Sequence, residues 1–169
     1  MKTTIYEATT ANGMIARKNG DMGFLSDMEW QGFMQMAYDV GNCIIGRKTF
    51  DVLLEKGKFP LNCFNVVLSK GKRDNKWPKT VAFCKSPKAA LKLLAAKGFK
   101  EALVMGGGLT NTSFIKSRLA DKIIVDIEPM LLADGIKLFE GKDFENKLKL
   151  EDAQKFSTDE VRLIYRVIK

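Results

Sequence analysis

The residues of this chain best suited to handle a proton and a flat ring are a carboxylate and an aromatic side chain, Glu29 and Phe33. They are four positions apart, so a helix would present both on one face. The carboxylate can pair with ring N–H groups while the phenyl ring packs on the face of the same heterocycle. Apolar surroundings would raise the pKa of Glu29 and help it to transfer a proton near neutral pH. The alternative interpretation is a surface carboxylate above a core phenylalanine.

A run of three glycines, Gly106, Gly107 and Gly108, follows the apolar residues 102–105 and precedes a segment typical of a helix, 109–115. This order predicts a strand, a glycine turn and a helix start. Glycine allows close backbone approach, and the free N–H groups at the start of a helix favour an anion. The run therefore predicts a phosphate or diphosphate site. A tight structural turn is the alternative.

A second segment has the same order of features. Residues 42–45 predict a buried strand, and Gly46 then leads into a helix that reaches about residue 56. Arg47, Lys48 and Thr49 lie in the first turn of that helix. Basic side chains at a helix N-terminus oppose the helix dipole, so their presence there suggests a bound anion.

A third strand end is also basic. Residues 66–68 are followed by Ser69, Lys70 and Lys72, for which a solvated loop is the alternative interpretation. In open α/β sheets, ligands bind outside the carboxyl ends of the strands. Three such ends could hold three phosphates, and NADPH carries a diphosphate and a 2′-phosphate. NADPH is therefore one ligand that could bind at these strand ends.

Length and composition limit the class of protein. With 169 residues and 46% hydrophobic content, the chain is expected to form one domain over residues 1–169. Its apolar runs are too short to span a membrane, and residues 1–7 lack the apolar core of a signal peptide. A small anionic ligand accounts for the net charge of +8 without a nucleic-acid recognition motif. Cys43, Cys63 and Cys84 form no CxxC pair, and their apolar neighbours predict buried thiols in a reducing cytoplasm.

The chain contains no histidine. This absence excludes Ser-His-Asp hydrolysis, Cys-His proteolysis and histidine-ligated metal sites, so no metal is expected. Acid–base chemistry must come from carboxylates, lysine, tyrosine, cysteine or water.

The order of elements predicts an α/β fold: a single-domain, mixed, mostly parallel central sheet with flanking helices and a C-terminal antiparallel hairpin. Ser26 or Asp27 can cap the first helix, and Pro87 begins the third. The strands are expected at 3–10, 42–45, 65–69, 81–83, 102–105 and 123–127, with the hairpin at 147–150 and 161–168. The helices are expected at 28–38, 47–56, 87–95 and from 109.

The order of these motifs resembles dihydrofolate reductase and its relatives, including the reductase domain of riboflavin biosynthesis. The segment 46–50 is similar to the family's Gly-Arg/Lys-x-Thr-Trp/Phe block, and 105–108 to its glycine block under the diphosphate. Residues 67–69 resemble the strand end that binds the 2′-phosphate. The segment 29–33 matches the acidic-x-x-x-Phe helix that holds the pterin. Ala8 and residues 12–16 lie where the first strand and mobile loop of the family frame the nicotinamide.

The resemblance implies a role for each matching residue. Glu29 is the expected catalytic carboxylate, and Ala8, Phe33 and Asn65 are the expected substrate contacts. The expected cofactor contacts are Ala8, Ile15, Gly46, Arg47, Lys48, Thr49, Ser69, Lys70, Lys72, Gly106, Gly107, Gly108, Leu109, Thr110 and Asn111.

The chain departs from the dihydrofolate reductase pattern at the substrate side. Asn111 stands where the family usually has a tyrosine, and Val125 where a threonine supports the catalytic carboxylate. The arginine that binds the folate tail would fall near Cys63, with Lys56 or Lys58 as substitutes. The segment 128–139 is more similar to the riboflavin branch. However, the Gly-x-x-Thr block is not followed by the acid-rich segment that would mark a ribose-phosphate site. The two acids there, Asp51 and Glu55, are typical of a solvated helix face.

These observations predict an NADPH-dependent reductase of a pterin-like C=N bond, with dihydrofolate as the best single substrate. The alternatives are a ribosylaminopyrimidine reductase of riboflavin biosynthesis and a non-catalytic nucleotide-binding protein of the same fold. We expect a cytoplasmic monomer or homodimer that binds a small molecule, with neither a membrane nor a nucleic acid as partner.

Overall fold

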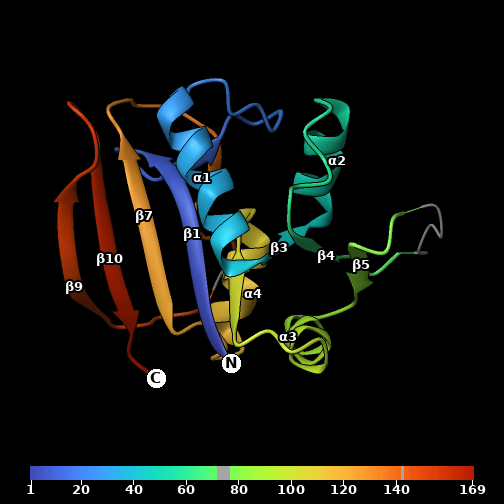
Figure 1. Ribbon diagram of the computed structural model, residues 1–169. Helices are drawn as coiled ribbons and strands as arrows, with labels where there is room; N and C mark the ends of the chain where they lie inside the picture. The colour runs from blue at the N-terminus through green and yellow to red at the C-terminus, as the bar shows by residue number, and fades with distance from the viewer. Residues whose placement is uncertain (72–76, 142) are drawn as a thin grey trace.

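The centre of the structure is an eight-stranded sheet with the strand order β5-β4-β3-β6-β1-β7-β10-β9 (Figure 1). This computed structural model describes residues 1–71, 77–141 and 143–169. The strands of the sheet are β1 (Lys2–Thr10), β3 (Asn42–Gly46), β4 (Phe64–Leu68), β5 (Val81–Cys84), β6 (Glu101–Val104), β7 (Lys122–Glu128), β9 (Leu148–Lys155) and β10 (Val161–Val167).

The predicted fold class is confirmed. All neighbouring pairs from β5 to β7 are parallel, and β10 runs antiparallel to both β7 and β9. The β9–β10 pair is the expected C-terminal hairpin. Strand β9 is longer than predicted. All eight of its residues are exposed, so the sequence carries little indication of where the strand ends. An edge strand exposed on both faces has no apolar alternation to mark its length.

A second, two-stranded sheet was not predicted. Strand β2 (Met14–Ala16) pairs antiparallel with β8 (Ile136–Lys137). Segments of three and two residues are too short to show a hydrophobic period. The small sheet brings the loop after β1 next to the residues that follow β8.

The described residues form four helices, which cover both faces of the sheet (Figure 1). One hydrophobic core lies between the sheet and the helices on each face. The helices α1 (Asp27–Val40) and α2 (Arg47–Glu55) cover the face that carries Tyr6 of β1. The helices α3 (Pro87–Ala96) and α4 (Gly108–Lys116) cover the opposite face, which carries Ile5. Because successive residues of a strand point to opposite faces, β1 contributes side chains to both cores.

The four helices begin in two different ways. Ser26 caps α1, where its Oγ accepts a hydrogen bond from the backbone N–H of Glu29, and Ser86 caps α3 in the same manner. The helices α2 and α4 instead begin at Gly46 and Gly107, and neither has a side-chain cap. Two helix starts therefore keep backbone N–H groups without a side-chain acceptor.

No helix among the described residues has both the length and the apolar character needed to cross a membrane. Likewise, no group of three or more His, Cys, Asp or Glu side chains in the described part of the chain could hold a metal ion. Cys43 and Cys84 are buried, as expected, whereas Cys63 is half-buried.

Candidate functional site

The two uncapped helix starts lie side by side at the carboxyl ends of neighbouring parallel strands, β3 and β6. The backbone N–H of Gly46 donates to the carbonyl oxygen of Gly106 at 2.7 Å. A Cβ added to Gly46 would lie 2.4 Å from Oγ1 of Thr110. Glycine at position 46 therefore allows the two helix starts to approach closely.

The glycine turn receives side chains from two further elements. A Cβ on Gly107 would lie 3.4 Å from Oγ1 of Thr49 and 3.8 Å from Cδ1 of Ile15. The structure thus brings together the β2 segment, the first turn of α2 and the turn before α4. These are three of the segments that the sequence assigned to one cofactor site.

The remaining predicted cofactor residues differ in their surroundings. Arg47 is half-exposed, and its Nε donates to both oxygens of Asp51 at 2.8 and 3.1 Å. Ser69 ends the strand next to β3, and Lys48, Lys70 and Leu109 are exposed. Gly108 and Thr110 are buried. Lys72 lies outside the described residues.

Two predicted ligand contacts are instead buried hydrogen-bonding residues. Asn65 is fully buried, and its side chain bonds with the backbone of Leu61 and Cys63. Asn111 is also fully buried, and its Nδ2 donates to Oε1 of Glu7 at 2.7 Å and to the carbonyl of Leu138 at 3.0 Å. Because these amide groups already bind the protein, the structure gives both asparagines a structural role in place of the expected ligand contact.

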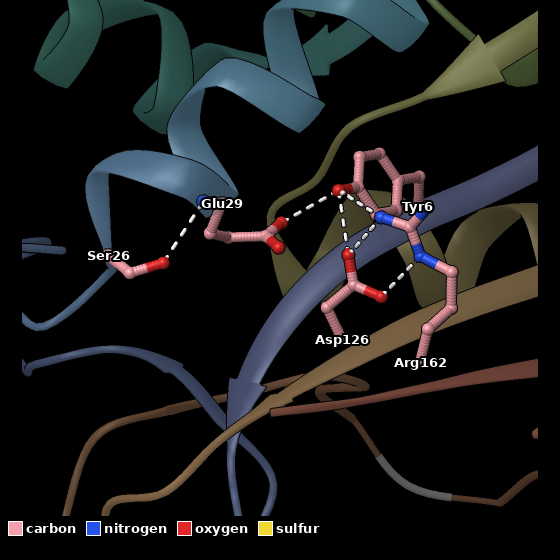
Figure 2. A network of polar contacts seen from close by, with 5 residues as sticks. All are labelled: Tyr6, Ser26, Glu29, Asp126 and Arg162. Carbon is pink, nitrogen blue, oxygen red and sulfur yellow. Dashed lines mark hydrogen bonds and ion pairs between the residues drawn. The ribbon is translucent and has the colours of Figure 1, made fainter. Parts of the chain in front are cut away.

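A polar network lies on the α1 side of the sheet (Figure 2) and joins four elements through Tyr6, Glu29, Asp126 and Arg162. The guanidinium of Arg162 binds both carboxylate oxygens of Asp126, at 2.7 and 2.5 Å. Its Nη2 also donates to the hydroxyl of Tyr6 at 3.1 Å. The pair with Arg162 compensates the charge of Asp126, so Glu29 has no cation of its own in this network.

The tyrosine hydroxyl determines where a second proton must lie. Its oxygen is 2.8 Å from Oε1 of Glu29 and 2.8 Å from Oδ2 of Asp126. A hydroxyl has one proton and can donate to only one of these oxygens. If one of the two carboxyl groups is protonated, it donates to the tyrosine oxygen, and the tyrosine donates to the other carboxylate. Both contacts are then hydrogen bonds. Glu29 is the group that holds this second proton, because Asp126 is already paired with Arg162.

Electrostatics agrees with this assignment. Burial, together with the neighbouring Asp126, raises the pKa of Glu29 to about 8. Burial and the two carboxyl groups also raise the pKa of Tyr6, so the phenol keeps its proton. Oε2 of Glu29 is buried without a hydrogen-bond partner. Glu29 is therefore a neutral carboxyl group at neutral pH, as the sequence predicted from apolar surroundings.

Glu29 and Phe33, which the sequence predicts on one helical face, both pack against side chains of the protein. Glu29 is only 1% exposed, because the Tyr6 side chain lies beside its carboxyl group. The ring of Phe33 packs on Trp30, with centroids 5.4 Å apart, and on Tyr6. Tyr6 therefore contacts both Glu29 and Phe33, where the sequence predicted a bound heterocycle.

A cavity of about 270 Å³ opens next to this network, between the residues that precede α1 and those that follow α2. Met22, Leu25 and Trp30 give it an apolar wall. Its charged lining residues are Asp27, Lys58 and Lys56, and Lys56 pairs with Asp21 at 2.9 Å. Nζ of Lys58 lies 4.0 Å from the ring centroid of Trp30. The cavity combines an aromatic wall with cations, which suits a ring that carries an anionic group.

Of the two carboxylates at the start of α1, only Glu29 is buried. Ser26 is the cap of the helix, which resolves the choice between Ser26 and Asp27. Asp27 is exposed and lines the cavity. Ala8 is buried in β1 opposite Asp126 of β7.

Sequence reasoning missed Tyr6, Glu7, Asp126 and Arg162. Each lies within a strand, where a single polar residue is easily taken for the exposed side of an alternating pattern. Asp126 offered the clearest signal, since it interrupts the apolar run of β7 at a position that the parallel sheet buries. Arg162 gave none, because its partner is 36 residues away along the chain.

The strand order and the paired helix starts place the chain in the dihydrofolate reductase-like superfamily of α/β proteins. Residues 2–161 match the family model of the RibD C-terminal domain, and the chain belongs to that family. Membership of this family points to an oxidoreductase.

The curated relatives are uncharacterized proteins of Bacillus subtilis. YwjB is 29% identical over 161 residues, which cover 92% of each chain. YyaP is 26% identical over 171 residues, which cover 94% of this chain and 90% of that protein.

Solved structures share the fold. A putative riboflavin biosynthesis protein from Shewanella sp. PV-4 has a TM-score of 0.84 and 23% identity, and the match covers both chains fully. The Thermotoga maritima diaminohydroxyphosphoribosylaminopyrimidine deaminase/5-amino-6-(5-phosphoribosylamino)uracil reductase has a TM-score of 0.75 and 18% identity. That match covers 99% of this chain and 56% of the Thermotoga chain. The family match is consistent with the riboflavin-type alternative and does not support the expected dihydrofolate reductase.

The raised pKa of Glu29 predicts a pH-dependent stability. The folded state holds a proton on Glu29 up to about pH 8, whereas an unfolded glutamate loses it near its ordinary value of 4.5. The folded state therefore binds more protons between these values, and stability falls as the pH rises through this range. One pKa unit corresponds to about 1.4 kcal/mol. In Glu29→Gln, we expect the decline in the free energy of unfolding between pH 5 and pH 8 to be smaller than in the parent.

Urea unfolding at each pH measures this effect, and Glu55→Gln on the exposed face of α2 is the matched control. Glu55→Gln should keep the slope of the parent. Identical slopes for the parent and Glu29→Gln would show that Glu29 is ionised in the folded protein.

Proposed function

We propose that this protein is an NADPH-dependent reductase whose substrate is a ribosylaminopyrimidine. The observation that carries the proposal is the pair of helix starts without side-chain caps, α2 and α4, at the carboxyl ends of adjacent parallel strands. Backbone N–H groups and helix dipoles at such a position favour a diphosphate. The family and the crystal structures that share its fold support a reductase rather than a passive nucleotide-binding protein.

The residues around the glycine turn fit a dinucleotide. Gly107 presents backbone with no side chain toward Thr49 and Ile15, which leaves room for a diphosphate to approach the start of α4. Arg47, Ser69 and Lys70 supply charge and a hydroxyl for a 2′-phosphate at the ends of β3 and β4. Ala8 and Ile15 would border the nicotinamide, which supplies a hydride when the cofactor is bound.

The cavity beside α1 supports an anionic aminopyrimidine as the substrate. Its aromatic wall at Trp30 would pack on the ring, and Lys56 and Lys58 would pair with a phosphate. Lys56 would first have to leave its ion pair with Asp21. Tyr6 lies beside Glu29, which favours the smaller pyrimidine ring over a pterin at this position.

Glu29 remains our candidate for the proton that accompanies the hydride. Its raised pKa keeps the carboxyl group protonated near neutral pH, and the Tyr6 hydroxyl links it to Asp126. Movement of Tyr6 would open Glu29 to a bound substrate.

The experiment that tests the function is the oxidation of NADPH, followed by near-UV absorbance, with 5-amino-6-(5-phosphoribosylamino)uracil or dihydrofolate. We expect turnover with the pyrimidine and none with dihydrofolate. Glu29→Gln should bind NADPH and lower turnover by roughly 10²-fold through the loss of general-acid help. Turnover of dihydrofolate alone would restore the pterin assignment, and NADPH binding without any turnover would favour a non-catalytic protein.

Cofactor choice tests the 2′-phosphate assignment. We expect tighter binding of NADPH than of NADH, and Arg47→Ala should weaken NADPH more than NADH. A well-formed charge-assisted hydrogen bond contributes roughly 1.5–3 kcal/mol. The half-exposed pair with Asp51 must break first, at small cost. Calorimetric titration of both cofactors measures the difference, with the exposed Lys88→Ala of α3 as control. Equal affinities in the parent protein would refute the assignment.

The glycine turn gives a separate test. The backbone of Gly107 has a φ of −73°, so a larger residue fits without a left-handed conformation. Gly107→Ala and Gly107→Val should weaken NADPH binding in that order while the melting temperature stays close to that of the parent. Gly106→Ala is the contrast, since its φ is +85° and its Cβ would lie 2.3 Å from Oε1 of Glu7. Normal NADPH affinity in a folded Gly107→Val would mean that the turn is only structural.

A further inference from the structure

A second buried carboxyl group lies directly beneath the glycine turn, on the face of β1 opposite to Tyr6. Glu7 is 7% exposed, and its Oε1 lies 2.3 Å from the position of a Cβ on Gly106. No side chain can therefore stand between Glu7 and the turn. The group takes no part in the network around Glu29.

One polar side chain binds Glu7. Nδ2 of Asn111, in the first turns of α4, donates to Oε1 at 2.7 Å and also to the carbonyl of Leu138. Oδ1 of the same amide is buried without a partner. The Asn111 amide thus connects β1, α4 and the residues after β8, and it fixes the carboxyl group against the turn.

The charged residues of the elements packed around the turn leave Glu7 without a counter-ion. Arg47 and Lys48 begin α2, but Arg47 pairs with Asp51 and Lys48 is exposed. Lys137 is the last residue of β8 and Glu140 follows that strand, and both pack on Gly108. β7 contributes the uncharged Val125 opposite Glu7. Among the described residues, no cation bonds with Glu7.

Burial without a cation raises the pKa of Glu7 to about 8, and the hydrogen bond from Asn111 lowers it only in part. The carboxyl group is therefore neutral in the physiological range and becomes an anion in mildly alkaline solution.

We infer that Glu7 is a positioning residue that must carry a proton for the turn at residues 106–108 to accept the diphosphate of the cofactor. This inference rests on the proposed function, because it assumes that NADPH binds at this turn. An ionised Glu7 would place a negative charge in a low-dielectric region next to the incoming diphosphate, and like charges at short range repel strongly there. NADPH binding therefore excludes the ionised form and takes up a proton.

The sign of the pH dependence follows. Below the pKa of Glu7 the group is already neutral, so affinity is independent of its titration. Above this value each pH unit lowers the fraction of protonated protein tenfold, and affinity falls by up to tenfold per unit. The 2′-phosphate does not interfere, since its own second ionisation, near pH 6, is complete in this range.

The experiment measures the dissociation constant of NADPH by calorimetric titration from pH 6.5 to pH 9.5 in the parent, Glu7→Gln and Glu29→Gln. Glutamine keeps the shape and the acceptor for Asn111 but cannot ionise. We expect the parent to lose roughly tenfold in affinity between pH 8 and pH 9.5. Glu7→Gln should lose this pH dependence whatever its absolute affinity. Glu29→Gln should keep it, because Glu29 lies on the opposite face of the sheet.

Titrations at pH 8.5 in buffers of different ionisation enthalpy provide the second readout. The parent should take up a proton on binding NADPH, and Glu7→Gln should not. A pH profile shared by the parent and Glu7→Gln, or one that only Glu29→Gln abolishes, overturns the inference and leaves the proposed function intact. Failure of the parent to bind NADPH at any pH overturns the proposed function and this inference with it.

Discussion

The close approach of two backbones, at Gly46 and Gly106, is the constraint on which the rest of the structure depends. A hydrogen bond of 2.7 Å joins them, and Thr110 fills the space where a side chain at position 46 would lie. This contact aligns the starts of α2 and α4 at neighbouring strand ends. The two helices then present N–H groups without side-chain caps to the same region, whereas a serine caps one N–H group at the start of α1 and of α3. The candidate anion site is a consequence of backbone geometry more than of charged side chains.

Strand β1 separates two buried carboxyl groups of different role. Tyr6 points toward α1 and binds Glu29, and Glu7 points toward α4 and binds Asn111. Burial raises the pKa of each carboxyl group to about 8, so both are neutral when the protein works near neutral pH. Burying an ionised carboxylate without a partner would cost far more than burying a neutral one. Asp126 is buried in a different way, because the cation of Arg162 compensates its charge.

The resemblance to dihydrofolate reductase was correct at the level of the superfamily, whereas no finding supports its emphasis on folate. The glycine turn and the Gly-Arg-Lys-Thr-Phe block concern backbone and cofactor geometry, which the two branches share. The substrate side depends on side chains from separated strands. Tyr6, Asp126 and Arg162 fill the region beside Glu29, and their meeting cannot be inferred from local spacing. The family match, over residues 2–161, is what distinguishes the two branches.

The sequence alone determined the helices, the strands of the central sheet apart from the length of β9, and the positions of the glycine turns, because hydrophobic period, capping residues and glycine act over a few residues. The short strands β2 and β8 were not predictable from it. The helix at Ser26, the mixed sheet and the burial-raised pKa of Glu29 were all predictable in this way. Tertiary structure decided which polar residues are buried together. It assigned Asn65 and Asn111 to structural hydrogen bonds, packed Phe33 on Trp30 and placed Glu7 beneath Gly106. These outcomes depend on contacts between residues far apart in the chain, for which a single sequence carries no periodic signal.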